Sequence, residues 1–390
     1  MKSALKNAPA LGGPLSAAER AGLSPEALVD ALKTMVLSRK LDDREVQLKN
    51  QSQIFFQISG AGHEAVLVAA GLHLRPAYDW FFPYYRDRAL CLMLGVTPYE
   101  MLLQAVGAAD DPASGGRQMP SHWGHRPLHV VSQSSPTGTQ CLHAVGCAEA
   151  GRYFATQADV PDRAVRFQDD EVVYVSIGDG TSSEGEFWES LNTACNRRLP
   201  VVYLIEDNGY AISVPVEVQT PGGDLSRLVE SFPGLHVVRT DGTDFVQSYV
   251  ACGEAIAYAR ARRGPALVHA KVIRPYPRSL SDDERLYKTP EERAAEAERD
   301  PIRRLSALLL EAGVLTDAAL AALTREAERV VAEAADRALA APKPARSTAG
   351  LYVYSPDVDP TSAAFEAAPL TEGKPETMVA AINRTLKDEM

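Results

Sequence analysis

The middle of the chain alternates between short apolar runs and amphipathic stretches. Residues 171–177 (EVVYVSI) and 201–205 (VVYLI) are almost uninterrupted runs of β-favouring residues, which is typical of strands buried on both faces. Between them, residues 184–198 repeat apolar positions at helical spacing. The apolar face of this predicted helix carries Phe187, Trp188, Leu191, Ala194 and Cys195. A strand, a helix and a second strand of these lengths predict a right-handed βαβ unit with parallel strands.

The strand pattern returns twice further along the chain. Residues 235–244 (LHVVRTDGTD) and 265–273 (PALVHAKVI) flank a helix predicted around 248–263. Near the N-terminus, apolar residues at helical spacing behind Ser24 and Pro25 predict an amphipathic helix. The predicted fold class is α/β, a doubly wound parallel sheet in which ligands bind at the carboxyl ends of the strands.

Changes in composition suggest how the chain is divided. Residues 1–25 are rich in Ala, Gly, Pro and Ser and are expected to form a flexible arm. Residues 26–341 are expected to form one domain, with a helical extension rich in Ala, Glu and Arg from about residue 284. Residues 342–376 are expected to form a linker, and residues 377–390 an amphipathic helix.

The charge and the cysteines exclude several classes of protein. A net charge of −11 over 390 residues argues against nucleic acid or an anionic membrane as the main partner. No segment reads as a signal peptide or a membrane span, so a soluble cytoplasmic protein is expected. The five cysteines form no CxxC pair, which argues against structural zinc and a disulfide framework.

A carboxylate and an amide side chain closely follow the two central strands. Asp179 and Asn208 stand just after these runs, and parallel strands bring their carboxyl ends to one edge of the sheet. Mg²⁺ prefers oxygen ligands and often takes several from phosphate and water, and the backbone carbonyl of Tyr210 would complete the protein's share. Gly178 and Gly180 allow a phosphate to approach the backbone closely. Gly-Asp-Gly alone is also ordinary turn chemistry, so the predicted magnesium–diphosphate site rests on the whole combination.

Residues 178–213, GDGTSSEGEFWESLNTACNRRLPVVYLIEDNGYAIS, resemble the thiamine diphosphate fingerprint of 2-oxo acid dehydrogenase α subunits. The resemblance extends from about residue 30 to residue 340. Within that family, residues 116–124 (GRQMPSHWG), 134–140 (SSPTGTQ) and 208–215 (NGYAISVP) are closer to the branched-chain type. The resemblance implies oxidative decarboxylation of a 2-oxo acid with thiamine diphosphate and Mg²⁺, and acyl transfer to a lipoyl group.

The resemblance also implies roles for individual residues. Tyr85 and Arg86 match the pair that holds the diphosphate, which suits a guanidinium and a phenol. Ser135 would lie beside the cofactor. The cofactor-binding set is Tyr85, Arg86, Ser135, Gly178, Asp179, Gly180, Thr181, Asn208 and Tyr210, with Asp179, Asn208 and Tyr210 also binding magnesium. A monovalent cation site, expected to take K⁺, would use Ser134, Thr139 and Gln140.

Two positions depart from the family pattern. Relatives carry histidine in a loop that corresponds to residues 274–283, RPYPRSLSDD, where this chain has none. Arg278 could bind an anion there, but arginine stays charged and cannot donate a proton as histidine does. Thr137 replaces a large aliphatic residue that props the cofactor. No catalytic residue is assigned from the sequence, and His63, His122 and His129 are left with either structural or site roles.

The C-terminal segment points to a partner. Residues 377–390 resemble the opening helix of the β subunit, which suggests an α–β fusion or a fragment of one, while a simple C-terminal helix is the alternative. In the family the β subunit supplies a catalytic glutamate, and the expected assembly is a heterotetramer that works with a lipoyl-bearing acyltransferase. Two other functions stay open: a different carbon–carbon bond reaction on the same cofactor, and a catalytically silent scaffold subunit.

Overall fold

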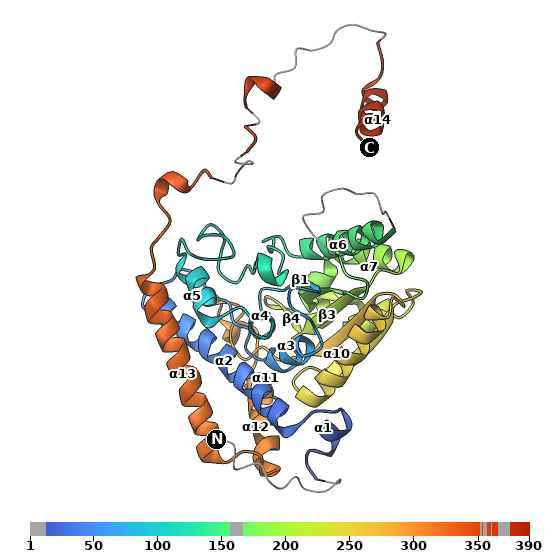
Figure 1. Ribbon diagram of the computed structural model, residues 1–390. Helices are drawn as coiled ribbons and strands as arrows, with labels where there is room; N and C mark the ends of the chain where they lie inside the picture. The colour runs from blue at the N-terminus through green and yellow to red at the C-terminus, as the bar shows by residue number, and fades with distance from the viewer. Residues whose placement is uncertain (1–12, 157–166, 352, 354–356, 360, 366–374) are drawn as a thin grey trace. The chain divides into compact units, whose positions relative to one another are not determined.

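The computed structural model describes residues 13–156, 167–351, 353, 357–359, 361–365 and 375–390. Its internal contacts divide the chain into two compact units, Met1–Pro344 and Ala345–Met390. The first unit contains the α/β domain with its sheet and surrounding helices (Figure 1).

Five parallel strands form the central sheet. They are β1 (Trp80–Phe82), β2 (Val173–Gly178), β3 (Val201–Asp207), β6 (His236–Asp241) and β7 (Ala266–Lys271). Their order across the sheet is β1-β2-β3-β7-β6, and every neighbouring pair is parallel. The predicted α/β fold with a parallel sheet is therefore confirmed, including the βαβ unit around residue 190.

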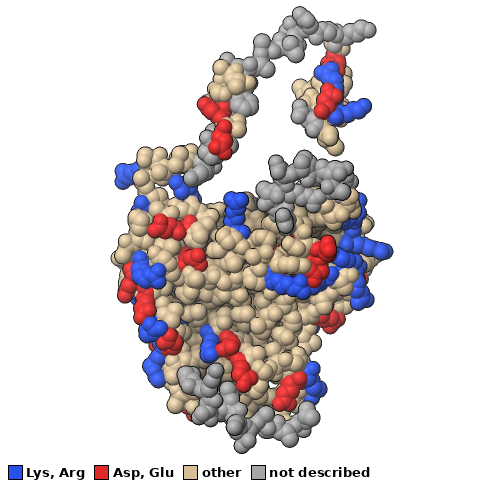
Figure 2. Space-filling view, viewed as in Figure 1, with Lys and Arg blue, Asp and Glu red and all other residues tan. Residues whose placement is uncertain are grey.

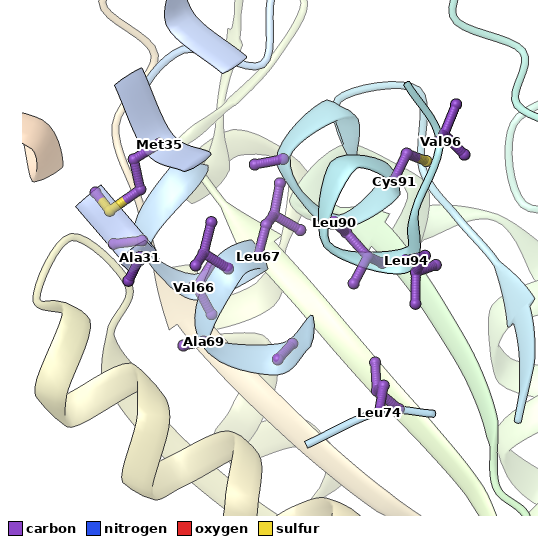
Figure 3. Close-up of a cluster of buried hydrophobic side chains, with 14 of the residues drawn as sticks. Ala31, Met35, Val66, Leu67, Ala69, Leu74, Leu90, Cys91, Leu94 and Val96 are labelled. Carbon is purple, nitrogen blue, oxygen red and sulfur yellow. The ribbon is translucent and has the colours of Figure 1, made fainter. Parts of the chain in front are cut away.

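Helices cover both faces of the sheet because alternate strand residues point to opposite sides. Tyr174 and Val202 belong to a core cluster with α2 (Pro25–Asn50), α3 (Glu64–Gly71), α4 (Arg88–Leu94) and α10 (Phe245–Arg260). Figure 3 shows apolar side chains of α2, α3 and α4 meeting in this cluster. Val175 and Tyr203 belong to a second cluster, with α6 (Thr139–Thr156) and α7 (Gly185–Arg197). The sheet is thus wound on both sides.

The helices after residue 284 pack onto this domain. They are α11 (Pro290–Glu298), α12 (Pro301–Glu311) and α13 (Asp317–Ala340). Helix α13 packs beside α2 and α5, and several of its alanines are almost completely buried (Figure 1). These helices lie in the range for which the sequence predicts a helical extension, and the small buried side chains of α13 let neighbouring helices approach it closely.

Part of the predicted N-terminal arm is folded. Residues 1–12 lie outside the described part, but Ser16–Arg20 forms the short helix α1. Leu15, Ala18 and Leu23 are buried in the first core cluster. The interpretation of residues 13–25 as a flexible arm was wrong, because these three apolar side chains anchor the segment.

The remaining elements are α5, several short helices and strands, and the helices of the second unit. They are α5 (Pro98–Val106), η1 (Arg126–Leu128), η2 (Asp179–Ser183), β4 (Tyr210–Ala211), β5 (Val214–Pro215), α8 (Val216–Gln219), η3 (Pro221–Gly223), α9 (Leu225–Val229), η4 (Glu284–Leu286), η5 (Arg346–Thr348), η6 (Ala363–Phe365) and α14 (Met378–Glu389). In the second unit, the Thr377 side chain caps α14 by accepting a hydrogen bond from the Ala380 N–H. Whether this segment opens a β part remains a prediction.

No helix in the described ranges is both long and apolar enough to span a bilayer. On the face shown in Figure 2, basic and acidic side chains are interspersed.

Helix α5 offers a stability test. Thr97 accepts a hydrogen bond from the Glu100 N–H, and the Glu100 carboxylate accepts one from the Thr97 N–H. Thr97→Ala removes this capping box and should lower the free energy of unfolding by about 1 kcal/mol. Urea unfolding followed by circular dichroism measures the change. Thr193→Ala, at an exposed position inside α7, should leave stability nearly unchanged; an equal loss in both variants would contradict the capping argument.

Candidate functional site

The ends of β2 and β3 bring Asp179 and Asn208 together. Asp179 opens η2 directly after β2, and Asn208 follows β3. The Asn208 N–H donates to Asp179 Oδ1 at 3.3 Å, and both residues are buried. Asn208 Oδ1 in turn accepts from the Tyr210 N–H at 3.3 Å. Three of the predicted site residues are therefore linked by hydrogen bonds, as adjacent parallel strands require.

The Asp179 carboxylate is incompletely paired. Its Oδ2 atom is buried and has no hydrogen-bond partner in the described structure. Burial, together with the neighbouring charge of Asp207, raises the pKa of Asp179 to about 7. A buried carboxylate without a partner is costly unless a cation or donor binds it. In the ranges that the structure describes, no three His, Cys, Asp or Glu side chains form a metal cluster, so a cation here would need other oxygen ligands.

Asp207 fixes the turn that carries Asn208. Its Oδ1 accepts from the Gly209 N–H at 3.0 Å. Its Oδ2 receives hydrogen bonds from His269 Nε2 at 2.7 Å and from Lys271 Nζ at 2.5 Å. These bonds lower the pKa of Asp207 although burial opposes the shift. Asp207 therefore remains charged and saturated, in contrast to Asp179.

The two glycines beside Asp179 allow close packing. A Cβ atom on Gly178 would lie 2.7 Å from the Tyr84 hydroxyl oxygen, and one on Gly180 would lie 2.8 Å from Ala211 Cβ. Gln219 Nε2 also donates to the Asp179 backbone oxygen at 2.7 Å. The turn is thus held by its neighbours and has no room for side chains at either glycine. Thr181, the next predicted residue, is buried within η2.

Arg86 lies in the turn after β1 and is almost fully buried. Its guanidinium donates to the backbone oxygens of Ser59 and, at 3.3 Å, of Arg278. It lies 5.2 Å from the centre of the Tyr85 ring, and its Nε has no partner in the described part of the chain. Tyr84 donates from its hydroxyl to Tyr85 Oη at 2.7 Å. The predicted Tyr85–Arg86 pair is therefore adjacent to Gly178 through Tyr84, with a buried donor unused.

A buried cluster beside these residues was missed by sequence reasoning. His63 Nδ1 lies 2.5 Å from Glu206 Oε2, and both side chains are fully buried. Burial lowers the pKa of His63 well below its usual value, helped by the charges of Arg86 and Arg274. Burial raises the pKa of Glu206, and the charge of the neighbouring Asp87 raises it further. The sequence signal was an acidic residue ending an otherwise apolar strand. His63 directly precedes α3, and its side chain bonds to Glu206 and does not cap the helix.

The segment 134–140 approaches β2 from the side of α6. Gln140 Nε2 donates to the Ser176 backbone oxygen at 3.3 Å, while Gln140 Oε1 is buried without a partner among the described atoms. No hydrogen bond in this part of the structure joins Ser134 or Thr139 to Gln140. The monovalent cation site remains a prediction. Ser135 Oγ lies 2.9 Å from His122 Nε2.

The loop without histidine is held by charged and phenolic groups. Arg274 is buried and donates to the Tyr287 hydroxyl at 2.7 Å. Tyr287 donates to Asp282 Oδ2 at 2.5 Å, and the Arg278 N–H donates to the same oxygen at 3.0 Å. Ser279 is buried beside Ser281. The loop is thus braced internally.

A cavity of about 580 Å³ lies elsewhere. It is lined by Trp80, His125, Arg126 and His129, and it includes none of the predicted site residues. Trp80 begins β1, whereas the predicted residues follow the strand ends. We therefore place the candidate site at the carboxyl edge of the sheet.

Comparisons with known proteins bear on this site. The profile of the Dehydrogenase E1 component family matches residues 32–347. The chain is 36% identical over 334 residues to the 2-oxoisovalerate dehydrogenase subunit alpha of Bacillus subtilis, covering 86% of this chain and 97% of the relative. It is 32% identical over 320 residues to the 3-methyl-2-oxobutanoate dehydrogenase subunit alpha of Mycobacterium tuberculosis, covering 82% and 80%. It is 32% identical over 294 residues to the pyruvate dehydrogenase E1 component subunit alpha of Mycoplasma pneumoniae, covering 75% of each.

Proposed function

The chain belongs to the dehydrogenase E1 component family, and from that premise we propose that it is the α component of a branched-chain 2-oxo acid dehydrogenase. Two of the relatives named above act on branched-chain 2-oxo acids by their names. The proposed reaction is oxidative decarboxylation, with transfer of the acyl group to a lipoyl disulfide on an acyltransferase partner. The cofactors would be thiamine diphosphate and Mg²⁺.

The unpaired Oδ2 atom of Asp179 is the observation that carries this proposal. Its buried Oδ2 and the neighbouring Asn208 suit a hard cation that brings phosphate oxygens with it. Tyr210 would add its backbone oxygen. The unpaired Nε of Arg86 suits a phosphate oxygen. The residues present therefore fit a magnesium-bound diphosphate.

The chain's own residues would bind and orient the reactants. Thiamine diphosphate, when bound, supplies the electron sink for decarboxylation. Asp179 and Asn208 would hold the cation, and Arg86 with Tyr85 would hold the diphosphate. Ser135, on the segment beside β2, would lie next to the reacting end. The proposed K⁺ site of Ser134, Thr139 and Gln140 would brace that segment.

The proposed enzyme needs partners. A β part, either a separate subunit or a fused continuation, would complete the site in a heterotetramer. The absence of histidine from residues 274–283 favours a second candidate, a different carbon–carbon bond reaction on the same cofactor. A scaffold subunit without turnover is the third.

Turnover separates these functions. The chain with its β part, thiamine diphosphate and Mg²⁺ is incubated with a panel of 2-oxo acids and an artificial electron acceptor. The proposal predicts reduction of the acceptor with branched-chain 2-oxo acids and little with pyruvate. Carbon–carbon ligation products without acceptor reduction would favour the second candidate, and cofactor binding without any turnover would favour the scaffold.

A further inference from the structure

His122 forms hydrogen bonds through both ring nitrogens. Nδ1 lies 3.2 Å from the Pro120 carbonyl oxygen, and Nε2 lies 2.9 Å from Ser135 Oγ. A carbonyl oxygen can only accept, so Nδ1 carries the hydrogen and Nε2 of the neutral ring is an acceptor. Ser135 therefore donates its hydroxyl hydrogen to His122. A hydroxyl group, an imidazole and a group that orients the imidazole are the arrangement through which a base withdraws a proton from a hydroxyl.

The backbone around His122 is held in a costly conformation. Ser121 has φ of 60°, the left-handed region that residues with a side chain seldom adopt. The buried Gln104 amide clamps it: Nε2 donates to the His122 backbone oxygen at 2.8 Å, and Oε1 accepts from the Ser121 N–H at 2.8 Å. Strain of this kind persists only where the surroundings enforce it, and it gathers at functional sites. The orientation of His122 is thus imposed from α5.

The segment that carries Ser135 passes beside the turn that follows β2. Ser135 is exposed, and its segment is tied to β2 through Gln140. A Cβ atom on Gly138 would lie 3.2 Å from Glu184 Cβ, at the start of α7 after the Gly178–Gly180 turn. The hydroxyl is therefore accessible to a ligand, whereas His122 is buried behind it.

We propose that Ser135 and His122 form a proton relay in which His122 supplies the imidazole that residues 274–283 lack. This inference rests on the proposed function. An N–H or O–H group of the bound reactants gives its proton to Ser135 Oγ while the hydrogen of Ser135 passes to His122 Nε2. The N–H or O–H bond of the reactant breaks as a new Ser135 O–H bond forms, and the old Ser135 O–H bond breaks as the His122 Nε2–H bond forms. The charge of the reactant falls by one, Ser135 stays neutral and His122 becomes an imidazolium. The reverse path returns the proton. Pro120 continues to accept from Nδ1 in both states.

Kinetics of the chain with its β part tests the relay. His122→Gln and Ser135→Ala should each lower kcat about 100-fold while KM changes less than about threefold. The double variant should be no slower than the slower single variant, because residues that act as one unit are not additive. Free imidazole should restore part of the kcat of His122→Ala. His125→Gln, whose ring contacts Glu100 instead, should stay within about twofold of wild type. Unchanged kcat in His122→Gln, or losses that multiply, would overturn the proposal.

A spectroscopic readout does not require turnover. With ¹⁵N-labelled histidine in the full chain, His122 should show the Nδ1–H tautomer, and Ser135→Ala should shift its Nε2 signal. An Nε2–H tautomer, or no response to Ser135→Ala, overturns the relay. Failure of the wild-type complex to bind thiamine diphosphate would instead overturn the proposed function. The measured tautomer of His122 would still test the relay.

Discussion

Asp179→Ala is expected to abolish magnesium-dependent binding of thiamine diphosphate while the chain stays folded. The carboxylate supplies the formal charge of the proposed cation site, and Asn208 and the Tyr210 carbonyl supply only neutral oxygens. Its loss should weaken binding by about 100-fold or more, since removing even groups that support a ligand costs about 10- to 100-fold. Calorimetric titration with thiamine diphosphate, with and without Mg²⁺, measures the effect. Unchanged affinity in the variant would show that the cation binds elsewhere.

In the ligand-free chain, replacing Asp179 by a neutral residue should raise stability at neutral pH, although it weakens cofactor binding. The folded-state pKa of Asp179 is raised from 3.8 to about 7, so the folded chain holds a proton that the unfolded chain releases over that range. Its burial as an anion therefore costs stability as pH rises from about 4 to 7. Asp179→Asn should unfold at a higher temperature than wild type at pH 8, and the difference should vanish near pH 4. A lower unfolding temperature for Asp179→Asn at pH 8 would contradict the view that burial of this carboxylate, with Oδ2 unpaired, costs stability.

Asp241 provides a matched control. It also ends a parallel strand, but its oxygens are bonded to Arg299 at 3.1 Å and Arg304 at 2.7 Å, which helps lower its pKa to about 2. Asp241→Asn should leave the affinity for thiamine diphosphate unchanged and should lower stability. Comparison of the two variants thus distinguishes a carboxylate that is proposed to bind a cation from one that is already paired with arginines.

The sheet was predictable because its strands carry their own signal. Residues 171–177 and 201–205 are apolar on both faces, and only a sheet covered on both sides buries such runs. The segment before residue 25 was misread because its few apolar residues, among them Leu15 and Ala18, become informative only against a partner surface. The local composition of this segment resembles that of a flexible arm, but composition does not show which residues pack against the rest of the domain.

The proximity of Asp179 and Asn208 was predictable for a similar reason, whereas the contacts around them were not. Asp179 and Asn208 follow strands, so parallel topology alone brings them together. The His63–Glu206 contact joins residues 143 positions apart, and no local sequence pattern predicts such a contact. The sequence does not decide whether His122 has a structural role or belongs to the site, because a lone histidine in a loop does not indicate which hydroxyl it will contact. The Ser135 contact depends on the positive φ of Ser121 and on a glutamine from another helix.

Gly178→Ala should disrupt the site through a single close contact. The new methyl group would lie 2.7 Å from the Tyr84 hydroxyl oxygen and 3.1 Å from Tyr84 Cζ, closer than atoms pack without displacement. Because Gly178 precedes Asp179 and Tyr84 precedes the Tyr85–Arg86 pair, relief of the clash moves the proposed cation site and the proposed phosphate site apart. The affinity for thiamine diphosphate should fall about 10- to 100-fold, as for an overpacking cost of about 1–3 kcal/mol expressed at the site.

Tyr84→Phe tests the origin of that loss. It removes the atom that the new methyl group meets first, so the double variant Gly178→Ala/Tyr84→Phe should bind thiamine diphosphate more tightly than Gly178→Ala alone. Tyr84→Phe by itself loses the hydroxyl bond to Tyr85 and the interaction of the hydroxyl with Arg86, and it should weaken binding less than about tenfold. Recovery in the double variant means that the second change partly cancels the loss of affinity caused by the first. Such non-additivity is expected for residues in contact. Simple addition of the two losses would mean that the space occupied by Tyr84 is not the reason for glycine at position 178, whose backbone has an ordinary extended conformation.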